Sequence, residues 1–382
     1  MGKEFIYAKE LYLEEEVLRA AYVGIEAGKI VSISTEVPEE EVSYYAEQLM
    51  PGFVDLHTHG NAGNDTMDGT YEAVNSMSQE LASYGVTAFC PTTLTAPLEK
   101  IEKALINVAD AKDKGVSGAE IIGTYVEGPY FTEKYKGAHP EDLFRRPSAK
   151  EIEHLYEIAR GEIAVVAIAP ETEGAEEAVL KAKELGIKVA MGHTDAGYET
   201  CRHMVNQGVS IGVHTFNGMR GLHHREPGTV GAILSDQRVY GEMICDGHHV
   251  HPAIMKVMYR CKGKEKMYLI SDAMCATGMK DGSYMLGELE VDVVDSIART
   301  KYGSLAGSTL KLVDGVFNLS EWAGIPLVEA VRMASLTPAE AVGRAGEMGS
   351  IAVGKKANLV AIEDRQVEQT WVGGKVVYSK GE

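Results

Sequence analysis

Two histidines, His57 and His59, stand one residue apart in the stretch PGFVDLHTHG, residues 51–60. The apolar run before them is typical of a β-strand, in which residues i and i+2 point to the same face. Two imidazole nitrogens on one face could bind the same metal ion. They could equally be two polar residues at the point where a strand gives way to a loop. The pair alone leaves both interpretations open.

Other residues that could bind a metal or carry a proton follow later apolar runs. They are Glu127 in YVEGP, His193 in AMGHTD, His214 in GVHTFN, His248 and His249 in DGHHV, and Asp272 in ISDAM. Each has an ordinary explanation by itself, such as a helix cap or a strand-end hydrogen bond. Together they favour a metal site, because buried polar groups at this density need partners and a divalent ion supplies them.

The middle of the chain alternates between strand-like and helix-like segments. Apolar runs begin at GFVDLH and continue with GVTAFCPT, AEIIGTYVEG, EIAVVAIAP, GIKVAMGH, GVSIGVH, RVYGEMICDG and KMYLISDA. Helical periodicity predicts helices between them, over residues 71–84, 97–112, 149–160, 173–185, 196–207 and 251–261. This βα alternation predicts a parallel sheet, and eight strands match a closed (β/α)8 TIM barrel.

An open doubly wound sheet is the alternative fold, but no glycine-rich phosphate or dinucleotide loop of the usual form follows the first strand. In a barrel, the C-terminal ends of the strands surround the mouth of the active site. The candidate residues above all stand at such ends, so we expect them to converge on one rim.

Both ends of the chain predict short antiparallel strands. Residues 20–33, AAYVGIEAGKIVSI, alternate in polarity on either side of a Gly-Lys turn, which is typical of a β-hairpin. Residues 357–378 contain two or three strands with Gly373-Gly374 as a tight turn. Neither end can form a core alone, so we expect one small β-sandwich made from both. The predicted α/β protein then has its small domain at 1–50 and 351–382 and a metal-dependent barrel at 51–350.

The charge and the cysteines restrict the partners and the compartment. Lys and Arg number 37 against 56 Asp and Glu, a formal net charge of −19, which argues against binding to nucleic acid or to an anionic membrane surface. The five cysteines form no C-x-x-C pair and fit a reducing cytoplasm. No apolar run reaches the roughly 18 residues of a membrane span. We therefore expect a cytoplasmic protein.

Several histidines are not assigned a role. His154 and His203 stand in charged helical stretches and are expected to be solvated, and His251 opens a helix as an ordinary cap or surface residue. His223 and His224 belong to a loop, RGLHHREPG. They could be functional residues or ordinary surface residues, and the sequence does not decide between the two.

The motifs PGFVDLHTHG, VEGPY, GHTDA, HTFNGM, DGHHV, SDAM and LAGSTL together resemble those of the N-acetylglucosamine-6-phosphate deacetylase family of the amidohydrolase superfamily. The resemblance covers essentially the whole chain, including the tail GSIAVGKKANLVAI. Single motifs are shared widely, whereas EGP, HTFN and DGHHV in this order are more specific. Strand 4 ends in VAIAPE without a lysine, which argues against the hydantoinase and dihydroorotase branches.

The resemblance implies a metal site. Glu127, His193 and His214 match the principal ligands, and His57 and His59 match a second pair, so one or two divalent ions are expected with Glu127 bridging. Zn²⁺ or Fe²⁺ is favoured over Mn²⁺ or Co²⁺, although all four suit such ligands. A bound ion would lower the pKa of water to about 7 and provide hydroxide for attack. Asp272 matches the catalytic general acid/base.

The resemblance also implies a substrate site for a phosphorylated amino sugar. Asn217, Gly218 and Arg225 match the family's phosphate site, although many family members have alanine at the position of Gly218. In the homodimer that the resemblance suggests, Arg225 could act in its own site or in that of the neighbouring subunit, and the sequence leaves both open. The matching substrate-binding residues are Ala138, His139, Asn217, Gly218, Arg225, His249, Leu305, Ala306 and Gly307.

The expected reaction is hydrolysis of N-acetyl-D-glucosamine 6-phosphate to D-glucosamine 6-phosphate and acetate. A related deacetylase acting on N-acetylgalactosamine 6-phosphate or an N-acetyl-amino acid is the alternative enzyme. A non-enzymatic scaffold is the alternative from another class, but scaffolds of this kind typically lack the ligands that this chain retains, including Asp272.

Overall fold

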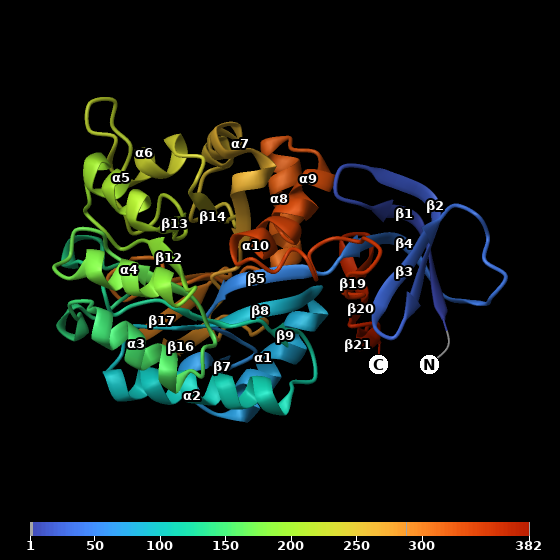
Figure 1. The fold of residues 1–382 in the computed structure, drawn as a ribbon, viewed down its shortest axis with the longest axis horizontal. Coiled ribbons are helices and arrows are strands. Elements are labelled where there is room, and N and C mark those ends of the chain that lie inside the picture. Colours follow the sequence, from blue (N-terminus) through green and yellow to red (C-terminus); the bar gives the residue numbers. More distant parts are fainter. Residues whose placement is uncertain (1–2, 288, 382) are drawn as a thin grey trace.

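The computed structural model describes residues 3–287 and 289–381 and has two parts, which lie side by side in Figure 1. The larger part is a strand barrel surrounded by helices, and in the smaller part the first and last strands of the chain lie together. We propose 51–350 as the barrel domain and 1–50 with 351–382 as the small domain, of which residues 1–2 and 382 lie outside the described residues.

Eight parallel strands form the barrel, in the order β5-β8-β10-β11-β12-β13-β14-β15. The first and last of these meet, because Thr58 and Ala273 form a parallel bridge and the Asp272 N–H donates to the carbonyl of His57 at 2.9 Å. This confirms the predicted (β/α)8 TIM barrel. The strand bounds are β5 (Phe53–Thr58), β8 (Val86–Thr93), β10 (Thr124–Val126), β11 (Ile163–Ile168), β12 (Lys188–Met191), β13 (Val209–Gly212), β14 (Tyr240–Ile244) and β15 (Met267–Ile270).

Burial explains why these strands are continuous apolar runs rather than alternating ones. Every residue of β5 and of β8 is buried, as expected for a parallel sheet covered on both faces. Leu56, Tyr125 and Ile270 belong to a core inside the barrel. A larger core joins the outer face of the strands to the helices. The packed interior leaves the strand ends as the place for a site.

The helices that cover the barrel agree with the predicted ones to within a few residues where a helix was predicted. The bounds are α1 (Tyr71–Ser83), α2 (Leu98–Lys114), α3 (Ala149–Ile158), α4 (Ala175–Glu184), α5 (Tyr198–Gln207), α6 (Gly228–Ser235), α7 (Pro252–Lys266), α8 (Leu312–Ala323), α9 (Leu327–Met333) and α10 (Leu336–Ala341). Helices α6, α8, α9 and α10 were not predicted. In α6, residues 228–234 are all buried and so show no amphipathic period.

The small domain contains a seven-stranded sheet in the order β21-β20-β19-β4-β1-β2-β3. The sheet curls on itself, because the Gly373–Gly374 turn meets the Ala27–Gly28 turn from the opposite edge of the sheet. A Cβ at Gly28 would lie only 2.7 Å from the Gly373 carbonyl oxygen. This confirms the predicted β-sandwich made from both ends. Its strands are β1 (Glu4–Tyr12), β2 (Val17–Glu26), β3 (Lys29–Ser34), β4 (Val42–Pro51), β19 (Leu359–Glu363), β20 (Gln366–Val372) and β21 (Lys375–Ser379).

A separate three-stranded antiparallel sheet was not predicted from the sequence. It consists of β16 (Gly282–Leu286), β17 (Leu289–Val294) and β18 (Ile297–Thr300). Its apolar side chains pack against Leu94 and Met274, which follow β8 and β15, so this sheet borders the C-terminal end of the barrel. The short strands β6 (Gly60–Asn61) and β7 (Asn64–Asp65) pair with each other, and β9 (Glu120–Ile121) pairs with β8.

All five cysteines are free thiols, and Cys261 alone among them is exposed. Within the described ranges no helix has the length and apolar character needed to cross a membrane.

Candidate active site

The residues expected to bind metal or carry protons lie at the C-terminal ends of barrel strands. His57 belongs to β5, Glu127 follows β10, and His193, His214 and Asp272 come shortly after β12, β13 and β15. The last three have φ angles of 45°, 23° and 49°. A left-handed backbone costs such residues on the order of 1–3 kcal/mol and is common at functional sites. The surrounding structure therefore holds these side chains in place against local strain.

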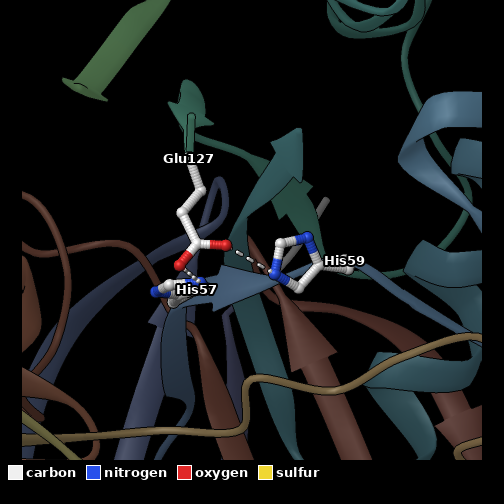
Figure 2. A group of neighbouring side chains, drawn as sticks. All are labelled: His57, His59 and Glu127. Atoms are coloured by element: carbon white, nitrogen blue, oxygen red, sulfur yellow. Dashed lines mark ion pairs between the residues drawn. The ribbon is translucent and has the colours of Figure 1, made fainter. Parts of the chain in front are cut away.

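The carboxylate of Glu127 is surrounded by five imidazole rings. Its Oε1 atom lies close to three Nε2 atoms, those of His214 (3.1 Å), His193 (3.3 Å) and His57 (3.6 Å). Its Oε2 atom lies close to two, those of His59 (3.1 Å) and His139 (3.5 Å). Figure 2 shows one oxygen facing His57 and the other facing His59. A carboxylate in this position could bridge two cations.

Two sets of these buried side chains have ligand atoms close enough to hold a metal ion: His57, His59 and Glu127, and Glu127, His139 and His193. His57 Nε2 is a buried nitrogen without a hydrogen-bond partner, which is unfavourable unless a ligand pairs with it. Imidazole and carboxylate donors suit Zn²⁺, Fe²⁺, Mn²⁺ or Co²⁺. The residues present therefore fit a divalent metal ion.

The position of His139 differs from its sequence-based assignment. The sequence assigned it to sugar contact, but the structure places it at ligand distance from Glu127 and His193. The His214 Nε2 atom lies 3.1 Å from His193 Nε2, so His139, His193 and His214 all lie close to the carboxylate of Glu127.

Hydrogen bonds on the far side of the rings orient two of the candidate ligands. The His193 Nδ1–H donates to the carbonyl of Tyr135 at 2.8 Å, and the His214 Nδ1–H donates to the carbonyl of Asn217 at 3.1 Å. A carbonyl only accepts, so Nδ1 carries a hydrogen, and Nε2, which faces Glu127, is the nitrogen available to a metal ion. Metal-binding histidines usually have this arrangement.

The electrostatics of the cluster also favour a cation. Burial opposes a charge on Glu127, but the positive charge of His57 and hydrogen bonds from His139 and His193 hold its pKa well below the usual value. Burial likewise opposes a charge on His59, yet hydrogen bonds to Asp272 and Glu127 raise its pKa to about 9. The two carboxylates therefore stay anionic and retain protons on nearby imidazoles, and a metal ion would take the place of those protons.

A cavity of about 250 Å³ opens above this cluster. Asp272 lies on its wall, with Oδ1 at 3.3 Å from His59 Nε2. His249 also faces the cavity, and its Nδ1 is fixed by a 2.6 Å hydrogen bond to Asp246. The other predicted substrate residues that line the cavity are Ala138, His139, Asn217, Gly218, Leu305 and Gly307.

Two predicted substrate residues do not line the cavity. Ala306 is buried in the core beneath the three-stranded sheet. Arg225 is exposed, and its guanidinium donates to His224 Nε2 at 2.7 Å. The role of Arg225 stays a prediction that depends on a neighbouring subunit.

The histidines without an assigned role lie apart from the cluster. His154 pairs with Glu102 at 2.9 Å and His203 with Glu176 at 3.2 Å, while His251 caps helix α7 through the Ala253 N–H. His223, His224 and His248 are exposed.

Sequence reasoning missed two kinds of site residue. Leu94, Leu286 and Ser304 line the cavity, and the last two belong to or follow the three-stranded sheet that was not predicted. Glu242 is a fully buried carboxylate behind the cluster. Its signal was present in RVYGEMICDG as a single charge inside an apolar strand, because a buried carboxylate requires partners.

Comparisons with known proteins agree with this geometry. The chain is 50% identical over 331 residues to the N-acetylglucosamine-6-phosphate deacetylase of Vibrio furnissii, with 86% of this chain and 83% of that protein covered. It is 42% identical to the N-acetylgalactosamine-6-phosphate deacetylase of Escherichia coli O157:H7, with 97% and 98% covered.

A solved structure of a relative has the same fold as this chain. A mutant N-acetyl-D-glucosamine-6-phosphate deacetylase from Mycobacterium smegmatis, in complex with N-acetyl-D-glucosamine-6-phosphate, superposes with a TM-score of 0.94 at 32% identity and covers 99% of this chain and 100% of that one. The model of the Amidohydrolase family matches residues 48–377. The chain belongs to the amidohydrolase family, in the group of N-acetylglucosamine-6-phosphate deacetylases that its motifs indicated.

Proposed function

We propose that this protein hydrolyses the acetamide of N-acetyl-D-glucosamine 6-phosphate to D-glucosamine 6-phosphate and acetate. The observation that carries the proposal is the group of imidazoles around Glu127, with Asp272 beside it on the wall of the cavity. The names of the relatives support the substrate.

Metal binding is divided between two ligand sets that share one carboxylate. Glu127, His193 and His214 would hold the principal ion, and His57 and His59, with the shared Glu127 carboxylate, would hold a second. A divalent ion, Zn²⁺ or Fe²⁺ before Mn²⁺ or Co²⁺, supplies Lewis acidity that polarises a carbonyl and lowers the pKa of water to about 7.

Asp272 is the general acid/base. Burial opposes its charge, but the hydrogen bond from His59 and the charge of His57 bring its pKa to about 2, so it is a free carboxylate at neutral pH. It accepts the proton of the attacking water and then delivers it to the departing amine. The proton's return is needed because an amine leaves poorly as an anion.

The histidines of the cavity wall bind and orient the substrate. Burial and the neighbouring His193 lower the pKa of His139 to about 4, so its ring is neutral at neutral pH. His249 is held by Asp246 and leaves Nε2 free for the substrate. Together with the metal site it stabilises the negative charge that develops on the carbonyl oxygen.

The sugar and the phosphate are bound by the remaining residues of the predicted site. Asn217 and Gly218 receive the phosphate, and Arg225 completes its binding from the neighbouring subunit of a homodimer. A fork-shaped guanidinium suits a phosphate. Free thiols fit a cytoplasmic enzyme. The residues proposed to contact the sugar are Ala138, His139, Leu305 and Gly307, while Ala306 supports them from the core beneath the three-stranded sheet.

The galacto epimer is the second candidate substrate, and one observation favours it. The relative from Escherichia coli O157:H7 is named for N-acetylgalactosamine 6-phosphate and matches 97% of this chain. The two sugars differ only at C4, and both place the acetamide and the phosphate alike. The chemistry proposed above is the same for either.

The test is acetate release by metal-replete protein from N-acetylglucosamine 6-phosphate, N-acetylgalactosamine 6-phosphate and unphosphorylated N-acetylglucosamine. We expect rapid turnover of the first, slower turnover of the second and little of the third. Equal turnover of the phosphorylated and free sugars would remove the phosphate assignment. Faster turnover of the galacto substrate would replace the proposed substrate by its epimer.

A further inference from the structure

Glu242 is a buried carboxylate that has no part in the function proposed above. It lies in the middle of β14, the seventh barrel strand, with no exposed surface. Burying a carboxylate without partners is costly, so its contacts should show what it does. It does not line the cavity of the active site, and any effect on catalysis must pass through other residues.

The contacts of Glu242 join residues of both metal ligand sets. Its Oε2 atom lies 3.1 Å from His57 Nδ1 and accepts the backbone N–H of His214 at 2.9 Å. Its other oxygen, Oε1, accepts the hydroxyl of Tyr268 at 2.9 Å. One carboxylate oxygen therefore touches the ring of a ligand from β5 and the main chain of a ligand that follows β13.

The contact with His57 fixes which ring nitrogen is available. A carboxylate only accepts hydrogen bonds, so Nδ1 carries a hydrogen, and Nε2, which points away from Glu242, is the nitrogen available to a metal ion. That Nε2 atom faces Glu127 Oε1 and Asp272 Oδ1, each at 3.6 Å, and has no hydrogen-bond partner. A carboxylate behind a histidine also makes the imidazole a stronger ligand.

The contact with His214 has a different effect. The backbone of His214 has a φ of 23°, which is unfavourable for a residue with a side chain. By accepting the N–H of His214, Glu242 stabilises this conformation and ties the position of the second ligand to that of the first.

We propose that Glu242 is a positioning residue of the metal site. It orients His57 so that Nε2 faces a divalent ion, and it fixes the position of His214 relative to His57. The inference rests on the metal ligands of the proposed function, but not on its substrate. Glu242 acts on metal affinity and touches neither the sugar nor the reacting atoms.

The test compares Glu242→Gln with Tyr268→Phe. The first replaces the carboxylate by a neutral amide of the same size. The second removes the hydrogen bond to Oε1 and leaves both contacts of Oε2, with His57 and with the His214 N–H. Zn²⁺ affinity and stoichiometry are measured on metal-free protein by competition with a chromophoric chelator. We expect Glu242→Gln to weaken Zn²⁺ binding by about 10–100-fold and Tyr268→Phe to change it less than about threefold.

The melting temperatures of the metal-free proteins distinguish a role of Glu242 in positioning the ligands from a role in stabilising the fold. A purely structural role would lower the melting temperature of both variants and leave Zn²⁺ affinity alike in the two, which would overturn the proposal. If Glu242→Gln does not fold, Glu242→Asp retains the charge but shortens the reach to His57, and unchanged affinity there would overturn it equally. Because no substrate is present, failure of the deacetylase assay and failure of this inference are separate results.

Discussion

Two regions of the molecule are rich in histidine, and they differ in almost everything else. In the ligand cluster, which consists of His57, His59, His139, His193 and His214 around Glu127, every ring is buried. In the 220–227 loop, His223 and His224 contact each other with ring centroids 4.3 Å apart, and both are exposed. The loop also carries Arg225, which hydrogen-bonds to His224.

The two regions differ in how firmly the barrel holds their histidine rings. Each cluster histidine comes from a barrel strand or a loop above one, and His193 and His214 have their Nδ1 atoms held by main-chain carbonyls. Among the described residues, neither of the two groups that could hold a metal ion includes a histidine of the 220–227 loop. Residue type therefore does not identify a site, whereas convergence of strand ends on one carboxylate does.

The largest expected effect concerns the proton carrier of the cluster. Asp272→Asn keeps the shape of the side chain but removes its ability to take a proton, and general acid/base catalysis contributes about 10²–10⁴-fold. We expect kcat for N-acetylglucosamine 6-phosphate to fall by about 10³-fold, while the metal content measured by elemental analysis is retained. A near-normal kcat would remove Asp272 from the mechanism.

A direct comparison of the two histidine regions should give the next largest effect. His214→Ala removes a ring that lies 3.1 Å from Glu127, whereas His224→Ala removes an exposed ring of the same chemistry. We expect the first to weaken Zn²⁺ binding by at least about 100-fold, more than the loss of an orienting partner does, and the second to leave it within about twofold. Chelator competition on both proteins measures this. Equal losses would mean that the loop also binds metal.

The barrel and the ligand cluster could be predicted because their signals are local. Eight apolar runs, each followed by a polar motif, indicated both the strands and the positions at their ends. The hairpin at residues 20–33 and the Gly373-Gly374 turn were equally readable, since turn residues and alternation lie within one short segment.

What could not be predicted depends on tertiary contacts. The strands of the β16–β18 sheet are short, and their buried side chains find apolar partners only in Leu94 and Met274, which follow other strands. The place of His139 beside Glu127, and the partners of Glu242, join segments that are far apart in the chain. No spacing in the sequence encodes those distances.

The dependence of metal affinity on pH should be a smaller effect. In the metal-free protein the pKa of His59 is raised to about 9 and that of His57 well above its usual value, so both rings hold protons at neutral pH. A metal ion must displace these protons to bind. The metal affinity therefore decreases as the pH is lowered below about 9. We expect a loss of about tenfold or more per pH unit between pH 8 and pH 6.

This dependence can be measured by chelator competition across that range, with His224→Ala as a control that should give the same slope. The carboxylates do not oppose the trend, because the pKa of Asp272 is about 2 and that of Glu127 lies well below its usual value. A flat affinity would contradict the idea that protons occupy the cluster in place of the metal.

The smallest expected effect tests whether the exposed loop has a function after all. Arg225→Ala should raise KM for N-acetylglucosamine 6-phosphate by about tenfold, since a hydrogen bond to a charged group contributes about 1.5 kcal/mol or more, and should leave KM for the free sugar unchanged. Arg238→Ala is a matched control, because Arg238 is also exposed and pairs with Asp236. Equal effects on both sugars would remove Arg225 from the phosphate site.

Mixing two defective subunits would show in which site Arg225 acts. A dimer of one Arg225→Ala chain and one Asp272→Asn chain contains, if the arginine crosses the interface, a site with an intact Asp272 and an intact Arg225. Activity at low substrate should then rise on mixing, although each parent alone is impaired. If Arg225 serves its own chain, that intact combination never forms and mixing gives no recovery. A gain would mean that the exposed loop completes the buried cluster of its neighbour, and the difference between the two histidine-rich regions would hold only within a single chain.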